Sequence, residues 1–223
     1  MRSKSAHASI DLGRIKQKKV KKFISAYGLH TTSGFAKMRP AGYDASFKST
    51  YRKHHKTFLV RQPVDLVWQA YKTIHPREAW NGQMVSFGLQ YSTVKNKLQY
   101  LQDEFHGLEA GQIIILNLRL LWGALNIAVA HQVVEVSDKD KTIKLSYMVG
   151  GASEGSQWIS MKETPEGFTQ VTHDTMYRSK SAFRDKTLYP GLHTKAIKEF
   201  HASVNQKAEN LAKHTGKIAA RVK

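Results

Sequence analysis

The side chains best suited to chemistry lie close together in a segment that is expected to form a β-strand. His173, Thr175 and Tyr177 alternate with other residues, and a spacing of two places side chains on the same face of a strand. Val171 has the same parity. If its apolar side chain points inward, the imidazole, the hydroxyl and the phenol line the interior, where they are suited to proton transfer or to hydrogen bonding with a ligand.

Two arginines follow this segment. Arg178 and Arg184 could each bind a carboxylate or a phosphate through two parallel hydrogen bonds, which is the geometry that a guanidinium group offers. Asp185 opens an alternative, because it could pair with one of them. In this second interpretation, which we favour, Arg184 and Asp185 fix the loop ahead of the last helix.

His131 is a third candidate for acid–base chemistry. It shares its parity with Ile127, Val129 and Val133 in a run of apolar and β-branched residues, so it is expected to point where they point. Buried polar groups are nearly always hydrogen-bonded, and we interpret His131 as a hydrogen-bonded core residue. If the protein is an enzyme, His131, His173 and Tyr177 are the acid–base candidates.

The remaining histidines predict no metal site. The chain has 11 histidines and no cysteine, with no HExxH pattern and no zinc-ligand spacing. His201 lies four residues before Asn205 in the last predicted helix and is expected at the surface. Residues 155–157 lack the GxSxG pattern of a nucleophile elbow, and residues 150–155 lack the GK[ST] of a phosphate loop. We expect neither a metal nor a cofactor.

The elements that must position these residues are a sheet and a long helix. Apolar and β-branched runs bounded by turn residues predict strands at 57–61, 84–92, 112–121, 125–136, 143–149, 157–162 and 168–177. Short polar turns between the later strands favour antiparallel pairing. Pro63 is expected to begin a helix and a helical turn follows at 76–80, while residues 95–106 could also be helical. Trp122 stands at the break between two strands, where it could border the mouth of a cavity.

The last element is an amphipathic helix over residues 192–211. Its apolar residues recur at steps of mostly three to five: Leu192, Ala196, Ile197, Phe200, Val204, Ala208 and Leu211. At 1.5 Å per residue such a helix is roughly 30 Å long, enough to cross a sheet. Gly216 is expected to end it, leaving a basic tail at 216–223.

The order of these elements resembles the helix-grip fold of the SRPBCC superfamily, which includes START domains and birch-pollen-allergen-like proteins. Residues 58–68, FLVRQPVDLVW, are similar to the first strand and the proline-started helix of that family. Residues 108–112 resemble its entry into the middle strands, and residues 134–143 resemble its next hairpin. The resemblance covers roughly 55–213. The extension before it and the length of segment 93–107 depart from the family pattern.

The resemblance implies an α+β domain at 55–215, in which a curved antiparallel sheet wraps around the C-terminal helix. It also implies a cavity between sheet and helix that holds a lipid, a steroid, a polyketide or another apolar molecule. No particular catalytic residue follows, because one fold supports different chemistry in different members. The candidate ligand-binding residues are His131, His173, Thr175, Tyr177, Arg178, Arg184 and Trp122.

The positive charge is concentrated at the two ends of the chain. Residues 1–57 hold 14 Lys and Arg against two acidic residues, and residues 195–223 hold seven against two, whereas the middle is nearly neutral. Residues 1–54 therefore form a basic N-terminal extension, with a disordered start at 1–9, a helix from Asp11 to Tyr27 stopped by Gly28, and an irregular or covering segment after it. Such an extension could bind nucleic acid or an anionic membrane surface, or could simply keep the protein soluble. We expect the core to fold without it.

Composition and hydropathy bound the remaining possibilities. The absence of cysteine excludes a disulfide framework and thiol catalysis, and it fits a reducing compartment. No signal-peptide pattern occurs in residues 1–24, and the longest apolar stretch, 118–134, is interrupted by polar residues, so no membrane span is predicted. We expect a cytoplasmic protein that binds an apolar small molecule or lipid. The alternatives are a cyclase- or hydrolase-type enzyme in the same cavity, and a nucleic-acid or anionic-surface binding protein.

Overall fold

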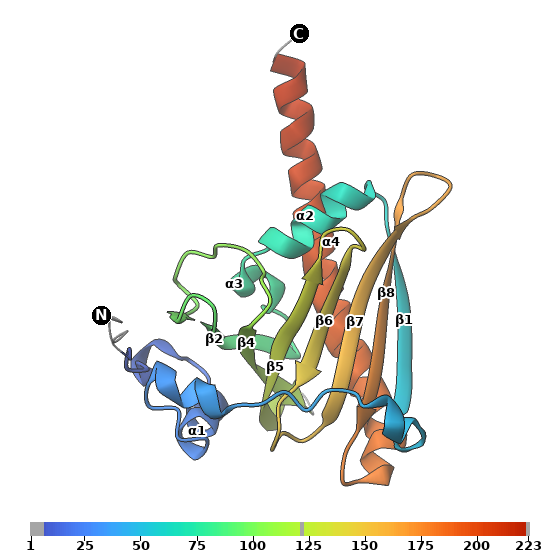
Figure 1. Ribbon diagram of the computed structural model, residues 1–223. Helices are drawn as coiled ribbons and strands as arrows, with labels where there is room; N and C mark the ends of the chain where they lie inside the picture. Colours follow the sequence, from blue (N-terminus) through green and yellow to red (C-terminus); the bar gives the residue numbers. More distant parts are fainter. Residues whose placement is uncertain (1–6, 121–122, 222–223) are drawn as a thin grey trace, which may run out of the picture.

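Eight antiparallel strands form one curved sheet (Figure 1) in the order β1-β8-β7-β6-β5-β4-β2-β3. The structure, a computed structural model, describes residues 7–120 and 123–221, the last seven of these by their backbone alone. The strands are β1 Arg52–Val60, β2 Val85–Ser92, β3 Lys97–Gln99, β4 Gln112–Leu120, β5 Leu125–Ser137, β6 Thr142–Tyr147, β7 Glu154–Glu163 and β8 Thr169–Arg178. The predicted antiparallel sheet is confirmed.

Two strand predictions need correction. β1 begins at Arg52, five residues earlier than expected, because its first residues pair with the far end of β8 up to Tyr177. The boundary expected at residue 54 therefore falls inside a strand. Residues 95–106 form no helix, since β3 is a short strand paired with β2 and the rest is loop and turn.

The predicted long helix is confirmed and is longer than expected. α4 spans Tyr189–Arg221 and continues a π-helical turn, η5, at Arg184–Leu188. Gly216 lies inside the helix, so the predicted stop and the separate tail after it were wrong. A single glycine costs a helix about 1 kcal/mol and does not interrupt its backbone hydrogen bonds. Among the described residues, no helix is long and apolar enough to cross a membrane.

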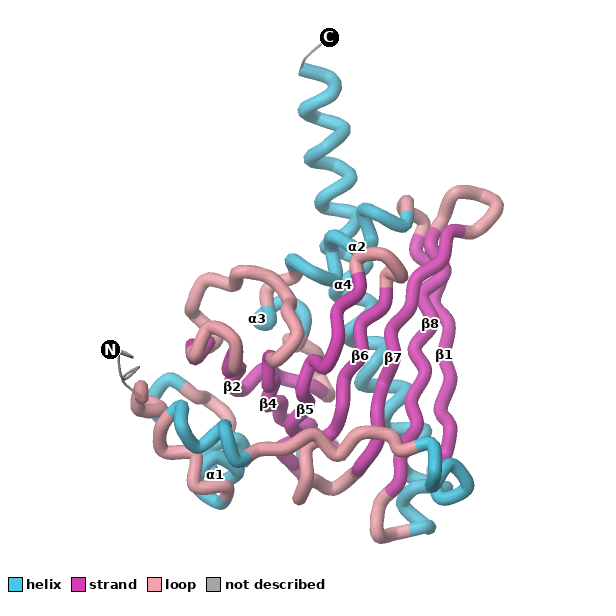
Figure 2. Tube along the Cα trace, viewed as in Figure 1, coloured by secondary structure: helices cyan, strands magenta, loops and turns pink. Residues whose placement is uncertain are grey.

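The inner face of the sheet packs against α4 and two shorter helices (Figure 2), α2 Val64–Thr73 and α3 Pro76–Ala79. The predicted apolar stripe of α4 faces this core, in which Val204 and Ala208 are almost fully buried against strand residues such as Val133 and Val171. Trp68 of α2 lies in the same cluster, at the place that the proline-started helix predicts.

The basic extension covers the outer face of the sheet, and Figure 1 shows it on the side away from α4. Its elements are η1 Leu12–Arg14, α1 Lys18–Ala26, η2 Thr32–Lys37 and η3 Ala45–Thr50. The expected helix from Asp11 is thus split, because Asp11 accepts a hydrogen bond from the Gly13 amide and caps a short 3-10 turn. Gly28 ends α1 with a positive φ of 63°, as predicted.

Apolar side chains on the extension form a second core with the outer face of β2, β4 and β5. Ile15, Val20, Ile24 and Phe35 are each at most 1% exposed, and they pack with strand residues such as Ile115. Removal of this segment would expose the apolar outer face of these strands to water. That the domain folds without it stays a prediction. Residues 1–6 lie outside the described part of the chain, but Ser9 already pairs with Thr31, so the disordered start does not extend to residue 9.

Close contact between α1 and the sheet depends on Gly88. A Cβ atom at this position would lie 2.7 Å from Cγ2 of Val20 and 2.8 Å from the carbonyl oxygen of Ile115. The pairing of β2 with β4 also shifts register between Phe87 and Leu89, as it does at a β-bulge. The missing side chain and the bulge together let the helix lie directly on the strand.

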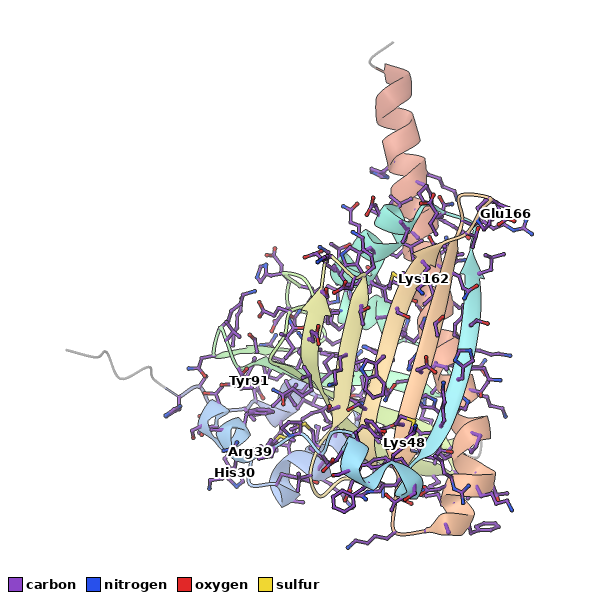
Figure 3. All side chains as sticks on the ribbon, turned by 45° about the vertical axis from the view of Figure 1, so that its right-hand side comes forward. His30, Arg39, Lys48, Tyr91, Lys162 and Glu166 are labelled. Atoms are coloured by element: carbon purple, nitrogen blue, oxygen red, sulfur yellow. The ribbon has the colours of Figure 1, made fainter. Side chains whose placement is uncertain are left out.

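The extension then crosses the sheet in an extended conformation. Figure 3 labels Arg39 and Lys48, which lie toward opposite ends of this crossing. Backbone hydrogen bonds of 2.7 Å join Ala41 to the carbonyl of Tyr147 and to the amide of Gly155. The crossing therefore ties the extension to β6 and β7 before the chain enters β1.

We predict that Phe35→Ala destabilises the protein by about 3–5 kcal/mol, the usual cost of removing a buried phenylalanine side chain. Phe35 is 1% exposed and stacks on Tyr91 of β2, whereas Phe47 in the same extension is 53% exposed. Phe47→Ala is the matched control and should cost less than 1 kcal/mol. Urea unfolding of the two variants measures both values, and equal small losses would show that the extension does not contribute to the core.

Candidate functional site

A cavity of about 440 Å³ lies between the inner face of the sheet and α4. Ile127, Val129 and His131 of β5 line it from one side, and Ile197 and Phe200 of α4 from the other, as their parity and helical spacing predict. Most of the other lining side chains are aliphatic or aromatic. The site is therefore a mostly apolar space whose lining comes from the sheet, α4, α2 and α3, and also includes Phe23 and Tyr27 of the extension.

Polar side chains gather on one part of the cavity wall. His173 of β8 points inward, is 2% exposed and lines the cavity, as predicted. Its Nδ1 atom lies 2.9 Å from Nε2 of His201 on α4, and its Nε2 atom lies 2.9 Å from Oε1 of Gln157 on β7. The same Gln157 reaches Nε2 of His131 at 3.1 Å through its amide nitrogen, and the hydroxyl of Tyr71 bonds Nδ1 of His201. A continuous chain of hydrogen bonds thus joins α2, α4, β8, β7 and β5.

His201 corrects a prediction. It was expected at the surface, but it is 4% exposed and lies inside this chain. His193, four residues before Ile197, and His201, four residues after it, fall on the apolar face of α4. Their spacing of four residues from Ile197 predicts that both histidines point toward the core.

Two further histidines lie next to the chain. Nδ1 of His193 lies 3.1 Å from Nδ1 of His54 on β1, whose Nε2 lies 2.9 Å from the hydroxyl of Thr194. The rings of His173 and His193 meet edge to face with their centroids 5.5 Å apart. Sequence patterns assign no role to His54 and His193, because only the folded chain brings β1 and α4 together.

Burial keeps these imidazoles neutral. Loss of hydration lowers the pKa of His131 to about 4 and that of His201 to about 3. It also lowers the pKa of His173 and His193 well below the ordinary value, and neighbouring imidazoles add to the effect. Within the described residues, no carboxylate hydrogen-bonds any of the five histidines, and no cluster of ligands suits a metal ion. The wall presents uncharged donors and acceptors.

Two further candidates of β8, Thr175 and Tyr177, do not line the cavity. Thr175 is fully buried and its hydroxyl has no hydrogen-bond partner among the residues that the structure describes, whereas the Tyr177 hydroxyl donates to the carbonyl of Asp185 at 2.7 Å. The Tyr177 ring stacks on the Tyr189 ring, with the two ring centroids 3.6 Å apart. Tyr189 in turn bonds the Tyr147 hydroxyl, and both of these tyrosines line the cavity. Phenols that the sequence did not single out therefore reach the site.

The two arginines have contacts within the protein. Arg178 points outward and bonds Glu154 at 3.0 Å and Thr50 at 2.9 Å. Arg184 lines the cavity, but its guanidinium donates to the carbonyl of Ala152 and the hydroxyl of Ser153. This geometry agrees with the interpretation in which Arg184 fixes the loop ahead of the helix. Trp122, expected at the cavity mouth, lies outside the described residues.

Asp185 holds the same loop. Its carboxylate accepts hydrogen bonds from the amide of Ser179 at 2.6 Å and from its hydroxyl at 2.7 Å. The side chain is buried and lies 4.0 Å from Arg184. These contacts connect the end of β8 to η5 and set where α4 begins.

Comparison with known proteins identifies the fold. No model of a known protein family and no curated protein matches this chain. Solved structures do match. Norcoclaurine synthase from Thalictrum flavum matches at 13% identity over 73% of this chain and 96% of that one, with a TM-score of 0.53. KanY matches at 15% identity over 71% of this chain and 98% of that one, with a TM-score of 0.51. Major latex-like protein 151 from Panax ginseng matches as well, at 12% identity over 70% of this chain and 97% of that one, with a TM-score of 0.50.

These neighbours are Bet v1-like proteins, and this chain shares their helix-grip fold. The resemblance inferred from the order of elements is confirmed at the level of the fold. At 12–15% identity, no functional residue of those proteins is assigned to a position in this chain.

We predict that the protein loses stability as the pH falls below about 6.5. Each buried imidazole stays neutral in the folded state but is protonated near pH 6.5 in the unfolded state, so the unfolded state binds more protons. The loss is about 1.4 kcal/mol per pH unit for each such histidine, down to its folded pKa of about 4 for His131 and about 3 for His201. Above pH 6.5 the contribution of these histidines to the free energy of unfolding is fully present.

Urea unfolding at pH 7.5, 6.5, 5.5 and 5.0 tests this dependence. His201→Gln should reduce the slope below pH 6.5, because one buried imidazole is gone. His30 is exposed, so His30→Gln removes an imidazole without touching the cluster and serves as the control. A free energy of unfolding that stays constant from pH 7.5 to 5.0 would contradict the neutral cluster.

Proposed function

We propose that this protein binds an apolar small molecule or lipid in the cavity between the sheet and α4. The observation that carries the proposal is the cavity of about 440 Å³, with an apolar wall and one convergent polar patch. Small-molecule sites are usually spaces of roughly 300–1,000 Å³ with this composition. A dry interior without a ligand role would be expected to be filled by side chains.

The fold neighbours support a ligand role. The norcoclaurine synthase of Thalictrum flavum has been solved in complex with dopamine and hydroxybenzaldehyde, and its structure matches this one at 13% identity with a TM-score of 0.52. That protein is named as a synthase. The second proposal is therefore an enzyme of the cyclase or hydrolase type that uses the same cavity. The polar patch favours binding over proton transfer, because His131 with a pKa of about 4 is a weak base and no carboxylate of the described residues hydrogen-bonds it.

We predict that filling the cavity abolishes ligand uptake. Val129→Trp places an indole on the inner face of β5, into the cavity that Val129 lines, and should weaken binding of the neutral probe N-phenyl-1-naphthylamine at least tenfold. Val134, on the same strand, is 41% exposed and does not line the cavity, so Val134→Trp should bind the probe like the parent. Fluorescence titration measures both, with circular dichroism as the check of folding. Equal affinity of all three proteins would place the binding site elsewhere.

A third proposal concerns polyanions and rests on the charge around α1. Lys16, Lys18 and Lys19 line a surface pocket together with Arg119, and no acidic residue is among its described lining residues. None of these three lysines forms a salt bridge with any described residue. The exposed face of the docked extension, rather than a free tail, is therefore the surface for nucleic acid or an anionic membrane.

We predict that replacing Lys16, Lys18 and Lys19 together by Gln weakens binding of a labelled single-stranded oligonucleotide and lowers the slope of log K against log salt by about 2. Release of counterions contributes about 0.7 to that slope for each phosphate contact on a single strand. The exposed lysines Lys139, Lys162 and Lys180 provide a control triple variant with the same change of charge. Identical slopes for both triple variants would show that charge alone, and not this surface, determines binding. Binding of anionic vesicles but not of the oligonucleotide would assign the surface to membranes.

A further inference from the structure

The amide of Gln157 gives the buried hydrogen-bond chain a direction. Its Oε1 atom only accepts, so His173 donates through Nε2–H, and because His173 is neutral its Nδ1 atom is an acceptor. His201 therefore donates from Nε2 and accepts at Nδ1, where the Tyr71 hydroxyl is the donor. On the other side, Nε2–H of Gln157 donates to Nε2 of His131. The proton of His131 consequently lies on Nδ1.

Tyr71 supports this orientation independently. Rotation of the Gln157 amide by 180° would reverse every bond in the chain, and His201 would then donate to the Tyr71 oxygen. The O–H hydrogen of Tyr71, which is 4% exposed, would have no acceptor among the described residues. A buried hydroxyl without an acceptor is costly, so the packing of α2 against α4 selects the direction in which Tyr71 donates.

The chain ends at the cavity with unused donors. His131 lines the cavity, its Nε2 atom is occupied by Gln157, and no described residue hydrogen-bonds its Nδ1 atom. The Tyr147 ring lies 4.6 Å from the His131 ring, and the Tyr147 and Tyr189 hydroxyls bond each other. Two hydroxyls carry two hydrogens and use one of them in this bond. Tyr147 also hydrogen-bonds Gln157, and because this contact lowers the pKa of Tyr147 the Gln157 amide is the donor and no hydroxyl hydrogen is used. One O–H is therefore left on the part of the cavity wall that His131, Tyr147 and Tyr189 line together.

We infer that the ligand carries an uncharged acceptor oxygen, such as a carbonyl or an ether, which accepts from Nδ1–H of His131 and from the spare hydroxyl of the Tyr147–Tyr189 pair. This inference rests on the proposed binding function and names the chemical class of its ligand. An ammonium group at the same place could not accept a hydrogen bond from His131 or from the tyrosine pair, because it has only donors. A pure hydrocarbon would leave both donors without a partner, which lowers its affinity relative to an oxygenated analogue of equal shape.

The tautomers of the histidines give a test without a ligand. Long-range ¹H–¹⁵N correlation spectra of the ¹⁵N-labelled protein at pH 7.5 distinguish a protonated Nδ1 from a protonated Nε2, with His→Gln variants for assignment. We expect the proton of His131 on Nδ1 and those of His173 and His201 on Nε2. The opposite tautomer at all three positions would reverse the chain and overturn the inference.

The ligand class is tested with two probes of nearly equal shape, 2-acetylnaphthalene and 2-isopropenylnaphthalene, which differ by a carbonyl oxygen in place of a methylene group. The ketone should bind the parent about tenfold more tightly, the effect of one buried hydrogen bond. The preference should disappear in the double variant His131→Leu, Tyr147→Phe. It should persist in Thr175→Val, because Thr175 is buried away from the cavity.

The outcomes separate this inference from the proposed function. Equal binding of both probes to the parent would overturn the assignment of an acceptor ligand and leave the binding function intact. Failure of both probes to bind the parent, together with failure of N-phenyl-1-naphthylamine, would contradict the binding function and the ligand class with it. Because the decisive comparison uses the parent protein, it does not depend on the stability of any variant.

Discussion

The central strands of the sheet carry apolar side chains on both faces, and this is the constraint that shapes the rest of the molecule. In β4, Ile114 and Leu116 face the inner core, whereas Ile113 and Ile115 face the extension. Apolar surface on either face must be removed from water at roughly 25 cal/mol per Å². The protein meets this need with α4, α2 and α3 on one side and with residues of the basic extension on the other.

Covering both faces also explains how a basic segment becomes part of the fold. In α1, Val20 and Ile24 are buried against the sheet, while Lys18, Lys19 and Lys22 are exposed. The charge that suggests an independent tail is thus the solvent face of an amphipathic helix. The same residues can stabilise the core and present a cationic surface, because the two roles use opposite faces of one helix.

On the inner side, the cover is incomplete, and the uncovered space is bounded by a neutral polar network. His173, His201 and Gln157 come from three different elements, and each satisfies the hydrogen-bonding groups of the next. Such a network holds sheet and helix at a defined separation and is costly to break, because each partner is buried. Because its partners within the described part of the chain include no carboxylate, the network is suited to positioning a ligand by hydrogen bonds.

Periodicity in the sequence determined the strands from 84 to 177 other than β3, the proline-started helix and the stripe of α4, because alternation by two and by about 3.6 records which face of an element meets the core. It also placed His131 and His173 on the inner face. Tertiary structure alone decided the rest. The surface expectation for His201 failed because its burial depends on partners, Tyr71 and His173, that are 130 and 28 residues away in the chain. The basic extension was taken for a separable tail because charge is visible in composition, whereas the apolar strand surface that holds it exists only once the sheet has formed.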